Sequence, residues 1–160
     1  ELQRFIRIYP KHKNLDYAYY LLALSYYEQI VDEKKDLQAI VSANETFKIV
    51  VKNFPNTEYA LDAEFKLDLI NDILASKEMY IGRYYLKKKA FLAAINRFRI
   101  VTVDYQTTSH VPEALHRTVE AYLSMGLLDE AYKTASVLGH NFPNNDWYKD
   151  SYELIQGNLE

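Results

Sequence analysis

The sequence predicts an all-α protein in which amphipathic helices stack as hairpins. Apolar residues recur at spacings of three and four along most of the chain, which is the period of a helix, and no segment shows the alternation that a strand requires. Aromatic residues followed by proline interrupt this pattern at Pro10, Pro55 and Pro143. Because proline lacks the N–H group that a continuing helix needs, each of these positions marks a helix end.

The periodic stretches between such stops define the expected helices, and Asn or Thr residues after two of the stops supply N-caps. The polar stretch VDEKKD at 31–36 is expected to form a loop. The helix at 58–75 runs through Leu61, Phe65, Leu69 and Ile73 and has no obvious partner in the pattern. The expected helices are residues 2–9, 16–31, 37–54, 58–75, 77–89, 91–104, 113–125, 128–141 and 147–157.

An internal repeat supports the stacking of hairpins. The segment NFPNTEY at 53–59 nearly recurs as NFPNNDWY at 141–148. Each unit places large, small and aromatic residues in order on its first helix and Ala before an aromatic on its second, an order typical of tetratricopeptide repeats. Examples are Leu22, Ala23, Tyr26, Ala43 and Phe47, and then Ile81, Gly82, Tyr85, Ala94 and Phe98. We therefore predict a superhelical array of tetratricopeptide-like hairpins with about eight or nine helices, in a single domain over residues 1–160.

Composition argues against several classes of function. The net charge of −3 offers no overall attraction to nucleic acid, and only the run of lysines at 87–89 speaks for such a partner. The chain has no cysteine, and its four histidines do not recur at the spacing of a zinc-binding helix. Glycine-rich phosphate loops and hydrolase motifs are absent from the sequence. We expect no enzyme activity, no metal and no other cofactor.

The fifteen tyrosines are the most unusual part of the composition. Tyr26 and Tyr85 occupy packing positions of the repeats, so they are expected in the core. Tyr20 and Tyr84 are freer, and they are candidates for the lining of a peptide groove because tyrosine carries a polar tip on a rigid apolar ring.

Two arginines border the apolar stripe of the helix predicted at 91–104. Arg97 and Arg99 fall about 100° to either side of the centre of that stripe. Such an arginine can lay its stem on apolar surface, or it can present its planar guanidinium to a carboxylate of a partner. The residues by themselves favour the packing role.

Three segments resemble the BamD family of outer-membrane β-barrel assembly lipoproteins. They are RFIRIYPKHKNLDYAYY at 4–20, FPNTEYALDA at 54–63 and EMYIGRYYLKKKAFLAAINRFRIVTVDYQTT at 78–108, the last with Gln106 where the family has proline. The resemblance implies a non-catalytic, lipid-anchored scaffold on the periplasmic face of the outer membrane. Helical spacing runs from the first residues of the chain, so we expect a chain truncated at its N-terminus, with the signal peptide and lipid anchor lying upstream.

The resemblance also implies partners and site residues. The C-terminal half, 76–160, would dock on the POTRA region of BamA, and the N-terminal half, 1–75, would meet other assembly lipoproteins and unfolded outer-membrane β-barrel proteins. The Asn-Arg pair of the family corresponds to Asn96 and Arg97, which makes Arg97 the preferred interface arginine. The expected BamA-binding residues are Arg97, Asn96, Arg99 and Tyr84, and those of the substrate groove are Asp16, Tyr17 and Tyr20.

Two other interpretations remain open on the sequence. The first is another tetratricopeptide adaptor, cytosolic or periplasmic, that holds a peptide on a tyrosine-lined concave face. The second is a helical-repeat enzyme regulator or nucleic-acid binder, which rests only on the lysine run.

Overall fold

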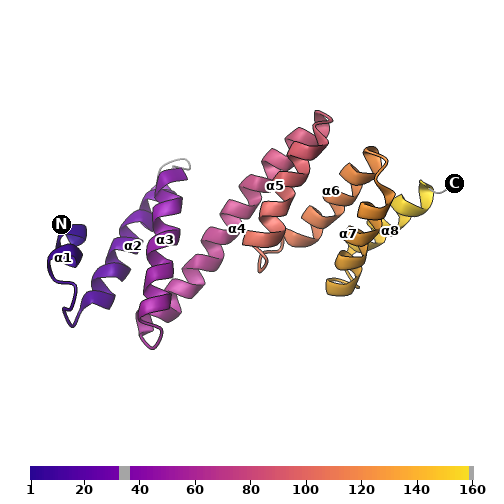
Figure 1. Cartoon of the computed structure of the whole chain (residues 1–160). Coiled ribbons are helices and arrows are strands. Elements are labelled where there is room, and N and C mark those ends of the chain that lie inside the picture. The colour runs from indigo at the N-terminus through magenta and orange to yellow at the C-terminus, as the bar shows by residue number, and fades with distance from the viewer. Residues whose placement is uncertain (33–36, 159–160) are drawn as a thin grey trace. The chain divides into compact units, whose positions relative to one another are not determined.

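The computed structural model describes residues 1–32 and 37–158, and within these residues it contains helices and turns but no strand (Figure 1). The prediction of an all-helical array is confirmed. In chain order, the helices of the described residues are α1 (Leu2–Ile8), α2 (Leu15–Asp32), α3 (Leu37–Asn53), α4 (Glu58–Lys87), α5 (Phe91–Asp104), α6 (Val111–Ser124), α7 (Leu128–Asn141) and α8 (Asp146–Gly157).

The main difference from the prediction is α4, which is one helix of 30 residues. We predicted separate helices at 58–75 and 77–89, and the predicted break near residue 76 is wrong. No proline or glycine stands between residues 56 and 81, and Ala75, Lys77, Glu78 and Met79 are strong helix formers. The repeat pattern marks packing positions along the chain, and packing positions alone do not end a helix.

The predicted loop at 31–36 is only partly described. Helix α2 continues to residue 32, so the first part of that segment is helical, and residues 33–36 lie outside the described residues.

Two helix ends share one backbone motif but fill it with different residues. After α4 the N–H of Ala90 donates to the carbonyl of Tyr85 and the N–H of Lys89 donates to that of Leu86, with Lys89 at a φ of 60°. After α6 the same pair of hydrogen bonds surrounds Gly126, whose φ is 73°. Glycine is the usual residue for this left-handed position because a Cβ atom is strained there.

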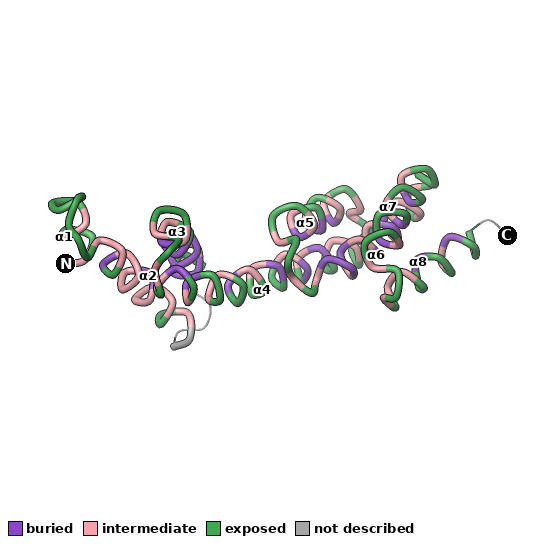
Figure 2. Tube along the Cα trace, turned by 90° about the horizontal axis from the view of Figure 1, so that it is seen from below, coloured by how far each residue is buried: buried purple, intermediate pink, exposed green. Residues whose placement is uncertain are grey.

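The chain divides into two compact units, residues 1–71 and 72–160, and the boundary falls inside α4. Unit 1 contains α1, α2, α3 and the first part of α4. Its buried core combines small residues with a few large side chains, among which Phe47 and Val50 of α3 and Ile70 of α4 are completely buried. Figure 2 shows buried positions alternating with exposed ones along α3 and α4, as amphipathic packing requires.

Unit 2 contains the remainder of α4 and helices α5 to α8. Met79, Phe98 and Val101 form a completely buried cluster with small residues of α4, α5 and α6. A Cβ atom at Gly82 would collide with the ring of Phe98, so the glycine is what lets α4 and α5 approach closely, as the repeat pattern predicted. Among the described helices, none combines the length and the hydropathy needed to cross a bilayer.

Candidate partner-binding site

The residues predicted for a substrate groove lie in unit 1, on α2. The ring of Tyr59, at the start of α4, has its centroid 5.3 Å from that of Tyr17 and 5.1 Å from that of Tyr20. Tyr17 is 43% exposed. Asp16 stands in the first turn of α2, where its Oδ1 accepts a hydrogen bond of 2.8 Å from the backbone N–H of Tyr17. The structure therefore brings the predicted residues together around one aromatic cluster, with Tyr17 on its exposed side.

Tyr20 is anchored inside this cluster. Its hydroxyl donates a hydrogen bond of 2.7 Å to Oδ2 of Asp62, and its ring packs at 6.4 Å on that of Phe47. Burial is the first cause that raises the pKa of Tyr20 to about 12, followed by the hydrogen bond and the negative charge of Asp62. The expectation that Tyr20 is freer than Tyr26 and Tyr85, the tyrosines at packing positions, is not supported, because Tyr20 packs and hydrogen-bonds within the cluster. Its contact with Asp62 joins residues 42 positions apart, for which the sequence holds no local signal.

The preferred interface arginine, Arg97, lies on α5 in unit 2 and is tied to its own chain. Its Nη1 donates to Oε2 of Glu78 on α4 at 3.1 Å, and the two side chains are 38% and 18% exposed. Burial, together with the charge of Glu78, also raises the pKa of Tyr105 at the end of α5. Arg97 thus edges the core as predicted, and Glu78 is the partner that sequence reasoning missed.

The other three residues predicted to bind BamA are exposed, and Arg99 lies on a different side of α5 from Arg97. Asn96 and Arg99 are exposed on α5. Since successive residues of a helix are rotated by about 100°, Arg99 points about 160° away from Arg97. Tyr84 is 55% exposed on α4, where Lys88 lies 5.9 Å above its ring. A flat partner surface can meet Asn96 together with Arg97 or with Arg99, but not all three.

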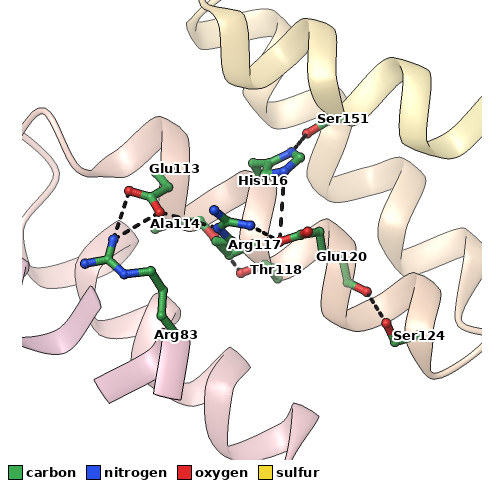
Figure 3. A network of polar contacts seen from close by, with 9 residues as sticks. All are labelled: Arg83, Glu113, Ala114, His116, Arg117, Thr118, Glu120, Ser124 and Ser151. Carbon is green, nitrogen blue, oxygen red and sulfur yellow. Dashed lines mark hydrogen bonds and ion pairs between the residues drawn. The ribbon is translucent and has the colours of Figure 1, made fainter. Parts of the chain in front are cut away.

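A polar network crosses unit 2 from α4 through α6 to α8 (Figure 3). Nη1 of Arg83 lies 3.0 and 3.1 Å from the two carboxylate oxygens of Glu113. Arg117 donates to Oε1 of Glu113 at 3.4 Å and to Oε2 of Glu120 at 2.7 Å. The spacing of three and four residues among the members on α6 is the one signal of this network that the sequence offers.

His116 connects the network to α8. Its Nδ1 lies 2.8 Å from Oγ of Ser151, and both residues are buried, Ser151 completely. The imidazole packs 5.0 Å from the ring of Trp147, over which the guanidinium of Arg117 lies at 5.2 Å. The remaining nitrogen, Nε2, is 3.9 Å from Oε2 of Glu120, too far for a hydrogen bond.

The environment of His116 disfavours its charged form. Burial lowers its pKa below the usual value, the charge of Arg117 adds to the effect, and the carboxylates of Glu120, Asp150 and Glu113 oppose it. The pocket of about 490 Å³ beside His116 is lined by side chains of α6 and α8. His116 is therefore a structural histidine between α6 and α8, in surroundings that disfavour its charged form.

Among residues 1–32 and 37–158, no group of His, Asp and Glu side chains is arranged to hold a metal ion. The acidic side chains of the network are paired with Arg83 and Arg117. The residues predicted to bind partners have side chains that are common at protein interfaces. Unit 1 contributes exposed tyrosine, and unit 2 contributes arginine, asparagine and tyrosine.

Comparison with known proteins agrees with the resemblance found in the sequence. A family model described as outer membrane lipoprotein (YfiO) matches residues 1–153. The chain belongs to this family. The match to the YfiO family covers both units, so the aromatic cluster of unit 1 and the arginines of unit 2 are both parts of a YfiO-type chain.

Several relatives carry the name outer membrane protein assembly factor BamD, which confirms the resemblance to that family. The proteins of Caulobacter vibrioides and Rickettsia prowazekii are each 52% identical to the chain, over 99% and 97% of its length. The protein of Neisseria meningitidis serogroup A is 33% identical over 95% of it. The chain spans 52%, 62% and 61% of the length of these three relatives, respectively.

Proposed function

We propose that the chain is a non-catalytic scaffold of the outer-membrane β-barrel assembly machinery, acting at the periplasmic face of the outer membrane. The observation that carries this proposal is the match of residues 1–153 to an outer membrane lipoprotein family whose relatives are named assembly factors. In this role the chain binds the POTRA region of BamA, other lipoproteins of the machinery and unfolded β-barrel proteins. The full-length protein carries the lipid anchor.

Unit 2 is proposed to dock on BamA through Arg97. The guanidinium is partly exposed and donates to Glu78 through Nη1, which leaves its other N–H groups for a carboxylate of the partner. Asn96 is the exposed neighbour that extends this contact. Arg99, which points away from Arg97, and Tyr84 are proposed to take part only at the margin of the interface.

The decisive experiment must separate binding from folding, because Arg97→Glu alone would set two carboxylates against each other. The double variant Arg97→Glu with Glu78→Arg preserves the internal ion pair while it removes the guanidinium from position 97. We expect its affinity for purified BamA POTRA domains, measured by calorimetry, to fall at least tenfold, which is about 1.4 kcal/mol or more. Unchanged affinity would remove Arg97 from the interface.

Two further variants calibrate that measurement. Glu78→Gln keeps the guanidinium at position 97 and releases it from its internal partner, so any loss of affinity should be smaller than in the double variant. Arg7→Glu reverses an exposed arginine on α1 in unit 1 and should leave the affinity for POTRA domains unchanged. An equal loss in Arg7→Glu would mean that the effect is one of net charge.

Unit 1 is proposed to receive unfolded β-barrel segments through Tyr17, with Asp16 at its side. Tyr17→Ala should weaken binding of a peptide from the C-terminus of a β-barrel protein. Tyr132→Ala is the matched control, since Tyr132 is 41% exposed and lies in unit 2. Equal binding by the two variants and the parent chain would place the substrate site elsewhere.

A further inference from the structure

An apolar ridge runs along the part of α4 that belongs to unit 1. Leu61, Phe65 and Leu69 are 72%, 66% and 44% exposed. They follow one another at intervals of four residues, so they form a row about 12 Å long on one side of the helix. The opposite side of α4 carries Ala63 and Ile70, which are completely buried. The ridge is therefore the outer face of a helix whose inner face is already packed.

Large apolar side chains are costly on a solvent face when they lie side by side. Single exposed apolar residues are normal on protein surfaces, but contiguous ones mark binding sites more often than chance. The helical spacing puts these three on one face, whereas helix stability requires only that the inner face be apolar. Three neighbouring positions thus carry large apolar residues that the fold of unit 1 does not use.

The charged residues on one flank of the ridge are both acidic. Glu64 and Asp68 are exposed, and each stands three residues after a member of the ridge, so their carboxylates border it. Within residues 58–71, all of which the structure describes, the single basic residue is Lys66. Its ammonium is engaged on the other flank, 3.3 Å from Asp62 and 5.4 Å from the ring of Tyr27. The ridge presents an apolar row with an uncompensated acidic border.

This pattern selects among possible occupants. A second copy placed ridge to ridge would bring Glu64 and Asp68 against the same carboxylates of its partner, which costs free energy. An anionic lipid surface would be repelled for the same reason. A protein segment that alternates large apolar residues with lysine or arginine fits both the row and its border.

We propose that the ridge Leu61, Phe65 and Leu69 is a docking surface for an amphipathic, basic segment of another protein, which lays its apolar side chains on the row and its cations on Glu64 and Asp68. The site lies in unit 1 and uses none of the residues assigned to the POTRA region or to β-barrel substrates. It adds a third contact surface to the scaffold.

The test uses two labelled synthetic peptides with leucines at helical spacing, one completed with lysine and the other with glutamate. Fluorescence anisotropy with the whole chain should show binding of the lysine peptide and none of the glutamate peptide. Leu61→Gln and Phe65→Gln should each weaken binding about tenfold, as expected for the loss of one large apolar contact. Glutamine is a good helix former, so both variants keep α4 intact.

A matched control and a charge variant make the result decisive. Leu92→Gln makes the same change at a leucine on α5 that is 66% exposed, and it should leave binding unchanged. Glu64→Lys with Asp68→Lys should reverse the sign of the salt dependence of binding and lower the affinity at low ionic strength.

Three results would overturn the proposal: equal binding of the glutamate peptide, an equal loss in Leu92→Gln, or self-association of the chain, by light scattering, that disappears in Phe65→Gln. None of these measurements uses POTRA domains, so the failure of this proposal and that of the proposed function are seen separately.

Discussion

Units 1 and 2 are held together by different chemistry. In unit 1, tyrosines of α2 pack on Tyr59 and Phe47, and the polar contact at the centre is a hydroxyl on a carboxylate, Tyr20 on Asp62. In unit 2, arginines and glutamates join α4 to α6, and a buried histidine joins α6 to α8. Burial raises the pKa of Tyr20 in the first arrangement, whereas it lowers the pKa of His116 in the second. One helical repeat pattern can therefore give two units whose stabilities depend on pH in different ways.

The largest expected effect is in the apolar core that the polar contacts surround. Phe47→Ala should lower the free energy of unfolding of unit 1 by about 3–5 kcal/mol, because a completely buried ring leaves a cavity. Hydrogen exchange of the amides of α3, which carries Phe47, would measure this loss. A loss below about 1 kcal/mol would mean that the core of unit 1 collapses around the gap.

The second prediction concerns the histidine of unit 2. His116→Ala leaves the completely buried hydroxyl of Ser151 without its partner and should destabilise the docking of α8 by about 1–3 kcal/mol. Hydrogen exchange of α8 at neutral pH, compared with that of α3, tests it. Faster exchange in both helices by the same factor would contradict the assignment of His116 to α8.

The pH dependence of that contact follows from the lowered pKa of His116. The folded state binds fewer protons than the unfolded state, so the stabilisation is complete above the unfolded pKa of 6.5 and is lost as the pH falls through the folded pKa. Exchange of the amides of α8 should therefore accelerate below pH 6.5, relative to those of α3. His116→Gln should flatten this difference, and an unchanged profile in that variant would assign the titration to another group.

The corresponding change in unit 1 is smaller and lies at the other end of the pH scale. Tyr20→Phe removes a hydrogen bond to a partly exposed carboxylate and should cost about 1 kcal/mol. Because the pKa of Tyr20 is raised to about 12, its stabilisation is present below pH 10 and is lost as the pH rises towards 12. Absorbance titration of tyrosinate should show one late-titrating tyrosine fewer in Tyr20→Phe than in the parent chain, in which the pKa of Tyr105 is also raised.

The smallest expected effect is at the end of α4. Lys89→Gly relieves a left-handed backbone position and should stabilise the chain by about 0.5–1 kcal/mol, whereas Gly126→Ala should destabilise the end of α6 by a similar amount. Thermal unfolding of the two variants measures both changes. A lower melting temperature for Lys89→Gly would show that the lysine side chain has a role of its own there.

The sequence predicted the fold class and most helix bounds because helical periodicity, prolines and capping residues act locally. It failed at α4, where repeat positions suggested a break that no residue between 71 and 81 imposes. For the site, the resemblance pointed to Arg97 and Tyr17, and helical rotation correctly put Arg97 at the edge of the core. Glu78, Asp62 and Ser151 could not be found, because their partners lie 19, 42 and 35 residues away in the chain.

The pairing of Arg97 with Glu78 has a consequence for how tightly the proposed interface can hold a partner. A free arginine must give up many rotamers when it is captured, which costs about 0.5–1.5 kcal/mol for a long side chain at an interface. Glu78 has already restricted Arg97 within the free chain, since it holds Nη1 at 3.1 Å. Arg97 has therefore lost part of its side-chain entropy on folding. A partner carboxylate that binds the other guanidinium nitrogens would not have to supply that part of the cost. In the proposed interface, Glu78 would therefore preorganise Arg97 for a carboxylate of the partner, at the cost of sharing the charge of the arginine.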